Sequence, residues 1–146
     1  MTKEKRKFFL KLENDSANLR LIREFVSGVA NEAGFDEDEI YQIELAVDEA
    51  CSNVVKHAYS QDKDKKEHSI ELEIHFDEKE FSVKVLDRGQ GFDPSQLPQT
   101  NMKSYLEKFQ VGGLGIRLMK SLMDQVEYSI KPGSKNQVTL TKYRKQ

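Results

Sequence analysis

The sequence predicts an α+β fold in which helices pack on one face of a mostly antiparallel sheet, forming a two-layer sandwich. Two stretches in the first half carry apolar residues at helical spacing. Two pairs of alternating stretches follow them, and a turn joins the members of each pair. A chain of 146 residues is large enough to bury a core without cross-links, so we expect residues 1–146 to form a single domain.

The first half of the chain is expected to hold one strand and two helices. Residues 7–12 (KFFLKL) form the strand, and the first helix has its cap at Asp15 or Ser16 and its stop at Gly34. The second helix begins after Asp36 and ends near Tyr59. Both helices carry an apolar stripe, made of Leu19, Ile22, Val26 and Val29 in the first and of Ile40, Ile43, Val47, Ala50 and Val54 in the second.

The second half of the chain predicts two hairpins with a third helix between them. Apolar residues alternate at 70–76 and 81–85 around a turn at 77–79, and again at 126–130 and 138–143 around KPGSKN. The third helix is expected from Gly113 to about Asp124.

An irregular segment, 92–111, separates the central hairpin from the third helix. It contains Pro94 and Pro98 and only a weak helical pattern. A connection of this length is unusual in a compact domain unless it covers or binds something. We therefore expect residues 93–111 to act as a lid.

The composition excludes several classes of protein. The formal net charge of −2 provides no overall field for nucleic acid or an anionic membrane, and the three basic clusters lie at expected ends or loops. The single cysteine, Cys51, excludes an internal disulfide framework and a cysteine-based zinc site. No apolar run is long enough for a membrane span or a signal peptide. We expect a cytoplasmic protein with no direct contact to nucleic acid or membrane.

Two polar residues on the second helix are candidates for chemistry. Glu49 and Asn53 are four residues apart, so they lie one turn apart on the same helical face, at the flank of the apolar stripe. Such a pair is common on solvated helix surfaces, so its interpretation depends on the remaining motifs.

Two glycine-rich motifs supply that context. DRGQGF (87–92) follows a strand, and its Asp87 could accept a hydrogen bond from a ligand while Gly89 and Gly91 let a planar group approach the backbone. VGGLGI (111–116) opens the third helix, where free N–H groups favour an anion. Neither G-x-x-x-x-G-K nor G-x-G-x-x-G is present, which excludes those two nucleotide-binding patterns.

Taken in order, these motifs resemble those of the GHKL ATPase superfamily, and most closely those of its anti-sigma factor serine/threonine kinases. The resemblance rests on ELAVDEACSNVVKHAY (44–59), VLDRGQGFDP (85–94) and GGLGIRLMKSLMDQVEY (112–128). It implies a histidine-kinase-like ATP-binding fold with ATP and Mg²⁺ as cofactors. In this context Glu49 and Asn53 are interpreted as directed at a nucleotide.

The resemblance also implies a role for each site residue. Glu49 would be the general base and Asn53 the Mg²⁺ ligand, while Asp87 would accept from the adenine amino group beside Gly89 and Gly91. The phosphates would be met at Gly112, Gly113, Leu114 and Gly115 as the lid closes. Two positions depart from the family pattern: Gln110 and Val111 stand where some members have a basic residue, and Asn136 and Gln137 stand where Gly-Thr is frequent.

The function that the resemblance implies is partner switching. The protein would sequester a sigma factor and phosphorylate a serine of an anti-sigma-factor antagonist of the STAS type, acting as a homodimer. Two alternatives stay open: an ATP-binding sequestering module with little kinase activity, and a detached histidine-kinase-type ATPase domain. The Glu49 carboxylate favours the kinase.

Overall fold

The computed structural model describes residues 5–59, 68–89, 115–131 and 133–145. In this part of the chain, five antiparallel strands form one sheet in the order β1-β2-β3-β5-β4. The strands are β1 (Arg6–Glu13), β2 (Ser69–Phe76), β3 (Glu80–Asp87), β4 (Gln125–Lys131) and β5 (Lys135–Tyr143). The helices are η1 (Ser16–Asn18), α1 (Leu19–Glu32), α2 (Glu37–Asn53), η2 (Val54–Ala58) and α4 (Gly115–Leu122). The predicted α+β sandwich is confirmed.

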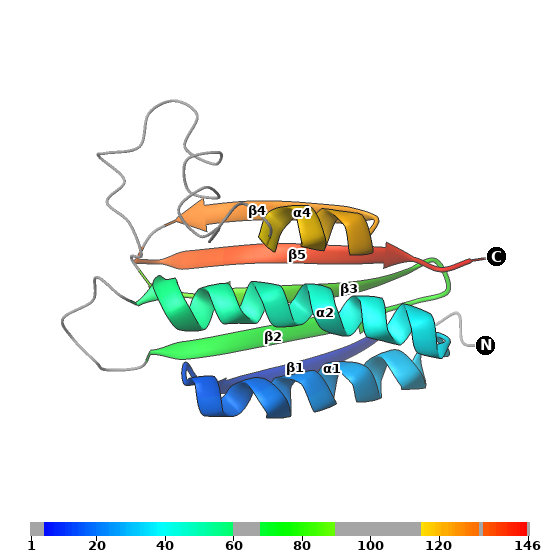
Figure 1. Cartoon of the computed structure of the whole chain (residues 1–146), viewed down its shortest axis with the longest axis horizontal. Coiled ribbons are helices and arrows are strands. Elements are labelled where there is room, and N and C mark those ends of the chain that lie inside the picture. Colours follow the sequence, from blue (N-terminus) through cyan, green and yellow to red (C-terminus); the bar gives the residue numbers. More distant parts are fainter. Residues whose placement is uncertain (1–4, 60–67, 90–114, 132, 146) are drawn as a thin grey trace.

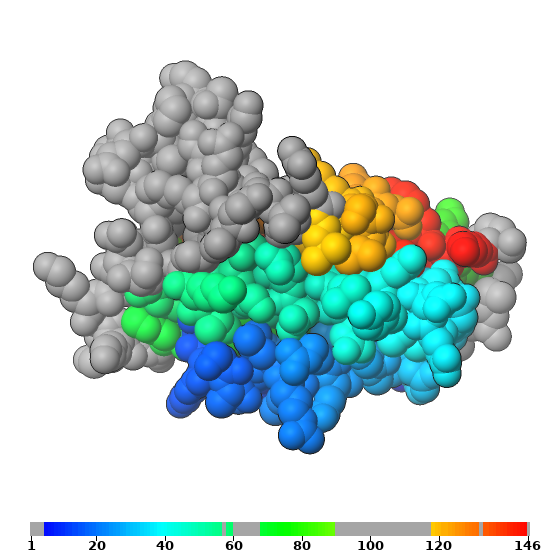
Figure 2. Space-filling model, viewed as in Figure 1, coloured from blue at the N-terminus to red at the C-terminus, as the bar shows by residue number. Residues whose placement is uncertain are grey.

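Helices α1, α2 and α4 lie side by side over one face of the sheet (Figures 1 and 2). Residues that pair across antiparallel strands share a face, so the register aligns Leu72, Val85, Val138 and Tyr128 toward the helices. The largest fully buried side chains come from both layers: Phe81, Ile22, Ile43, Ile70, Leu72, Ile74, Met119 and Leu140. No helix in the described ranges has the length and apolar character needed to cross a membrane.

The first two helical regions begin where the sequence predicts, and an aspartate caps each of them. Asp15 accepts a hydrogen bond from the backbone N–H of Ala17, although the first turn is a 3-10 helix rather than part of α1. Asp36 caps α2 through a reciprocal capping box with Glu39. Gly34 has a φ of 92°, a conformation that favours glycine, and it lies just beyond the end of α1.

The C-terminal end of the second helix differs in geometry from the prediction. Helical backbone does continue almost to Tyr59, but residues Val54–Ala58 form a π-helix, η2. Short π-helical segments within α-helices are frequent at functional sites. Here the change begins directly after Asn53, so the helical geometry changes next to a candidate site residue.

The last hairpin is tighter than the sequence predicts. β5 begins at Lys135, so the expected turn at 131–136 includes two residues that belong to the strand. Asn136 therefore pairs with Asp87 on one side and with Ile130 on the other. Helix α4 ends at Leu122, two residues before the predicted Asp124. The lid segment 93–111 lies outside the described residues.

Candidate functional site

The two flanks of α2 have different neighbours. On one flank, Glu44 accepts a hydrogen bond of 2.6 Å from the Ser27 hydroxyl, and Asp48 forms an ion pair of 2.9 Å with Arg23. These contacts join α2 to α1. Glu49 and Asn53, both half-buried, occupy the other flank. The predicted shared flank is confirmed, and it faces away from the α1 contacts.

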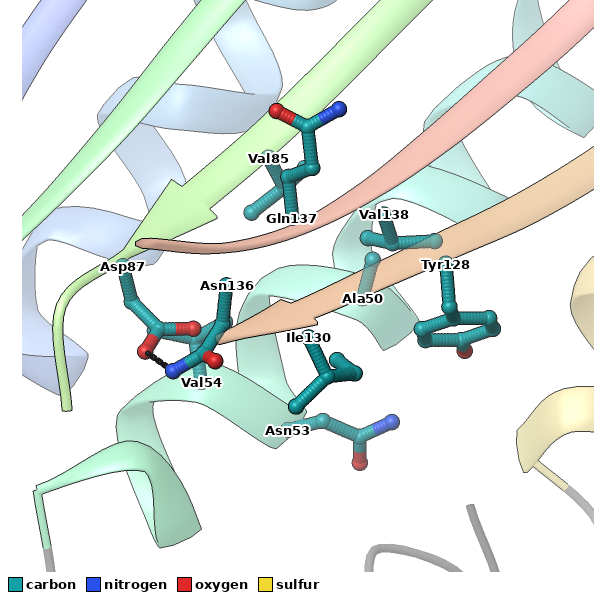
Figure 3. Close-up of a pocket in the computed structure, with 10 residues that line it drawn as sticks. All are labelled: Ala50, Asn53, Val54, Val85, Asp87, Tyr128, Ile130, Asn136, Gln137 and Val138. Atoms are coloured by element: carbon teal, nitrogen blue, oxygen red, sulfur yellow. Dashed lines mark hydrogen bonds between the residues drawn. The ribbon is translucent and has the colours of Figure 1, made fainter. Parts of the chain in front are cut away.

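A cavity opens where α2 meets the ends of β3, β4 and β5 (Figure 3). It encloses about 390 Å³ of empty space, its open mouth included. Its lining residues are Ala50, Asn53, Val54, Val85, Asp87, Tyr128, Ile130, Asn136, Gln137 and Val138. Apolar side chains beside a few polar groups are typical of sites for small organic ligands, and Asp87 together with Asn136 forms the polar end of this cavity. The cavity thus brings together Asn53 and Asp87, which are 34 positions apart in the sequence.

Asp87 is the buried acceptor at the polar end of this cavity. Only 3% of its surface is exposed. Its Oδ1 atom accepts a hydrogen bond of 2.9 Å from the Gly89 N–H and another of 2.9 Å from the Asn136 amide. A buried carboxylate needs such donors to offset the loss of water. They hold the side chain in one orientation against the apolar walls.

Gly89 lies in close contact with the end of η2. A Cβ atom at this position would come within 1.8 Å of the Ala58 carbonyl oxygen. The carbonyl oxygen of Gly89 accepts a hydrogen bond of 3.0 Å from the Gly133 N–H. The structure therefore explains the glycine at position 89 in a second way, besides the predicted approach of a planar ligand. The backbone of the π-helix occupies the space that a side chain would need.

Substituting Gly89 with alanine should be strongly destabilising. The clash is with backbone, which cannot rotate away as a flexible side chain could, so we expect a loss of about 2 kcal/mol or more in the free energy of unfolding. Gly28→Ala is the matched control: a Cβ atom added at this exposed helical position would have no neighbour within 4 Å, and the variant should gain about 0.5–1 kcal/mol. Urea titrations of both variants test this. Equal stabilities would contradict the close contact.

Tyr59 fixes the segment that follows Asp87. Its hydroxyl donates a hydrogen bond of 2.5 Å to the Ser69 carbonyl and accepts one of 3.1 Å from the Arg88 N–H. The Arg88 guanidinium in turn donates to the Ser134 carbonyl at 2.9 Å. Burial raises the pKa of the Tyr59 hydroxyl above its ordinary value. The segment Arg88–Gly89 is therefore held by contacts with the residue after η2, with β2 and with the β4–β5 turn. The DRGQGF motif alone does not indicate these contacts.

Tyr128 forms one wall of the cavity near Glu49. Burial raises the pKa of its hydroxyl, and the negative charge of Glu49 raises it further. The folded state therefore favours the neutral phenol. The stability that this preference contributes is fully present below the unfolded pKa of about 10, and it is lost as the pH rises toward the higher folded pKa.

An alkaline titration of stability tests the environment of Tyr128. Between pH 9 and pH 11 the wild-type protein should lose about 1.4 kcal/mol more unfolding free energy than Tyr128→Phe, which has no proton to release there. Tyr41→Phe, which replaces an exposed tyrosine on α2, is the matched control and should follow the wild-type curve. Parallel curves for Tyr128→Phe and the wild type would contradict a raised pKa of the partly buried Tyr128 hydroxyl.

Some of the remaining predicted residues lie within the described part of the chain, and others lie outside it. Gly115 is the first residue of α4. Gly91, Gly112, Gly113 and Leu114 lie outside the described residues. Cys51 is fully buried in the core, and burial raises the pKa of its thiol. Within the described ranges, no group of three or more histidine, cysteine or acidic side chains converges on a possible metal site.

Comparison with known proteins decides the family. Residues 12–142 match the family model described as the histidine kinase-like ATPase domain. The chain belongs to this family. Serine-protein kinase RsbW of Bacillus subtilis is 40% identical over 130 residues, which cover 84% of this chain and 76% of that protein. RsbW of Bacillus velezensis is 35% identical over 139 residues, covering 92% and 83%. Within the ATPase family, the chain therefore belongs with the RsbW serine-protein kinases, as its motifs predicted.

Solved structures support the fold. The RsbU and RsbW domains of a Mycobacterium tuberculosis protein align with a TM-score of 0.66 at 20% identity, covering 96% of this chain and 33% of that one. A SiaB–SiaC complex from Pseudomonas aeruginosa aligns with a TM-score of 0.66 at 11% identity, covering 92% and 88%. At these identities the likeness concerns the fold, and it confirms the predicted histidine-kinase-like architecture.

Proposed function

We propose that this protein is an ATP-dependent serine/threonine kinase that acts as an anti-sigma factor. It sequesters a sigma factor and phosphorylates a serine of an anti-sigma-factor antagonist. One observation carries the proposal: the half-buried Glu49 carboxylate lies one helical turn from Asn53, and Asn53 lines the same cavity as the buried Asp87. In this proposal, Glu49 is the general base, Asn53 supplies the oxygen for the metal ion, and Asp87 recognises the adenine.

The base of ATP is chemically complementary to the polar and apolar residues that line the cavity. Asp87 is held as an acceptor, which matches the amino group of adenine. Val85, Val138 and Ile130 supply apolar surface for the ring. The apolar walls contribute affinity for a planar ring, and the carboxylate orients that ring. Both are needed, since neither alone would distinguish adenine from other planar groups.

At the phosphate end, the chain contributes an oxygen and a base. Mg²⁺ keeps several waters and is often held by one or two protein oxygens together with substrate phosphates, so the Asn53 amide oxygen is a sufficient protein ligand. When bound, the ion neutralises charge on the phosphates. Glu49 then accepts the proton of the attacking serine hydroxyl, because it lies on the same flank as Asn53, one turn earlier. Gly112, Gly113, Leu114 and Gly115 are proposed to bind the phosphates under the lid.

The proposed partners follow from kinship with the RsbW kinases. They are a sigma factor, an antagonist of the STAS type and a second copy of this chain in a cytoplasmic homodimer. Analytical ultracentrifugation measures the last of these directly, and a monomer at all concentrations would contradict it. A pull-down from the native cell identifies the other two proteins for use in the assay below.

A transfer assay tests the kinase. The purified protein is incubated with γ-labelled ATP, magnesium and the antagonist recovered in the pull-down. We expect the label on one antagonist serine, and replacement of that serine with alanine should abolish it. Tight binding of ATP and of both partners without transfer would support a sequestering module instead. Label on a histidine of this chain would support a detached histidine-kinase domain.

Asn53→Ala should weaken the magnesium-dependent part of ATP binding. The substitution removes the proposed protein oxygen from the ion, so the affinity difference between Mg²⁺ and EDTA should fall by about tenfold, while affinity in EDTA changes little. Ser52→Ala, at the neighbouring half-buried position of α2, is the control. Calorimetric titrations with and without Mg²⁺ provide the measurement. An unchanged magnesium effect in Asn53→Ala would remove the metal assignment.

A further inference from the structure

The Asn136 side chain connects three segments at the polar end of the cavity. It lies on β5, directly paired with Asp87 on β3, and only 3% of it is exposed. Its Nδ2 atom donates to Asp87 Oδ1 at 2.9 Å and to the Gly89 carbonyl oxygen at 2.7 Å. Its Oδ1 atom accepts from the Lys131 N–H at 3.1 Å. One amide therefore joins the end of β3, the segment after it and the β4–β5 hairpin.

The chemistry of these partners fixes the orientation of the amide. The Asp87 carboxylate and the Gly89 carbonyl are acceptors, so the NH₂ group has to face them. The Lys131 backbone N–H is a donor, so the amide oxygen has to face it. A reversed amide would lose all three hydrogen bonds at once. Both donor hydrogens of Asn136 are thus used, and the carboxylate beside it has a single favoured orientation.

We propose that Asn136 is a positioning residue that sets adenine specificity by orienting the Asp87 carboxylate. This inference rests on the proposed function of the cavity as an ATP site. A hydrogen bond from an amide to a charged carboxylate is strong and directional, and at the buried Asp87 a small rotation of the acceptor would misalign its bond with the ligand. Asn136 supplies two donors and also ties down the hairpin.

The proposed positioning role of Asn136 and a role only in stabilising the fold predict different effects on ligand binding. The orientation of Asp87 matters for a ligand that carries an exocyclic amino group, and it matters little for one that lacks the group. Purine riboside triphosphate has the ring, ribose and phosphates of ATP without that amino group. A comparison of the two nucleotides therefore isolates the contact that Asn136 is proposed to align.

The experiment measures the affinities of ATP and purine riboside triphosphate, both with Mg²⁺, for the full chain and its variants. The wild type should prefer ATP. Asn136→Ala should weaken ATP by about tenfold and the analogue by less than about twofold, since one well-oriented hydrogen bond is lost only with ATP. Asn136→Thr restores one donor and should recover part of the preference. Thr139→Ala, on the same strand but on the sheet face away from the helices, should leave both affinities unchanged.

Each outcome distinguishes the two proposals. A wild type that binds both nucleotides equally overturns the Asp87–adenine contact and with it the base assignment of the proposed function. A wild type that prefers ATP, combined with an equal loss of both nucleotides in Asn136→Ala, shows a role in structure alone and overturns the positioning role. If Asn136→Ala does not fold, Asn136→Thr decides, because a full ATP preference in a variant with one donor would also overturn it.

Discussion

Glu49→Gln is expected to reduce phosphoryl transfer by roughly 10²–10⁴-fold, which is the usual contribution of a positioned general base. The amide keeps the shape of the side chain but cannot accept the proton of the attacking hydroxyl. Binding of ATP and of both protein partners should persist, since the proposed base contact arises only during reaction. Single-turnover transfer rates measured beside ATP affinities separate the chemical step from binding.

Glu44→Gln is the matched control for this experiment. It makes the same chemical change on the same helix, but Glu44 lies on the opposite flank, where it accepts from Ser27 on α1. It should affect stability through that contact and leave the transfer rate near the wild-type value. A fully active Glu49→Gln protein would remove the base assignment. If both substitutions lowered the rate equally, the effect would belong to the helix rather than to the site.

Asp87→Asn is expected to weaken ATP binding by about ten- to a hundredfold. The substitution removes the charge and replaces one acceptor oxygen with a donor, and a hydrogen bond to a charged group is worth about 1.5–3 kcal/mol. For the same reason the wild type should bind ATP at least about tenfold more tightly than GTP, because guanine presents a carbonyl oxygen where adenine has an amino group.

The isosteric substitution is preferable to alanine at this position. Asp87 accepts from Gly89 and Asn136, and alanine would leave two buried donors without their partner. Calorimetric titrations with ATP and GTP provide the measurement, with thermal melting as the check on folding. Equal affinities of the wild type for the two nucleotides would contradict the proposed contact. So would a folded Asp87→Asn protein with unchanged ATP affinity.

Periodicity predicts most of the fold because each of its signals is local. The centres of β2 and β3 predicted from alternation lie within one residue of the observed centres. The start of α2 after Asp36 is likewise visible in the sequence, just before the apolar stripe that begins at Ile40. Helical spacing likewise places Glu49 and Asn53 on one flank. These predictions require only the geometry of a single helix or hairpin, and the residues that form one helix or hairpin are contiguous in the sequence.

The parts that the sequence does not predict depend on contacts between distant segments. Gly89 is constrained by the backbone at Ala58, 31 positions earlier, and no local pattern records that approach. The π-helix after Asn53 has no signature of its own in the sequence. Asn136 stands out in the sequence only as a departure from Gly-Thr within an expected turn, because a polar residue after KPGSK gives no sign that a strand has begun. Its pairing with Asp87 exists only in the folded sheet.

The strand order has a consequence for protein synthesis. β5 is the last strand in the described chain, yet it lies between β3 and β4 in the sheet and provides Asn136 to the Asp87 carboxylate. While the ribosome is still making the hairpin, β3 has no neighbour on that side, and Asp87 lacks one of its donors. The nascent chain therefore cannot form the proposed base-binding end of the cavity until residues through β5 have emerged. On the proposed ATP site, the nucleotide stabilises only chains that have completed this hairpin, and a truncated product is expected to gain no protection from it.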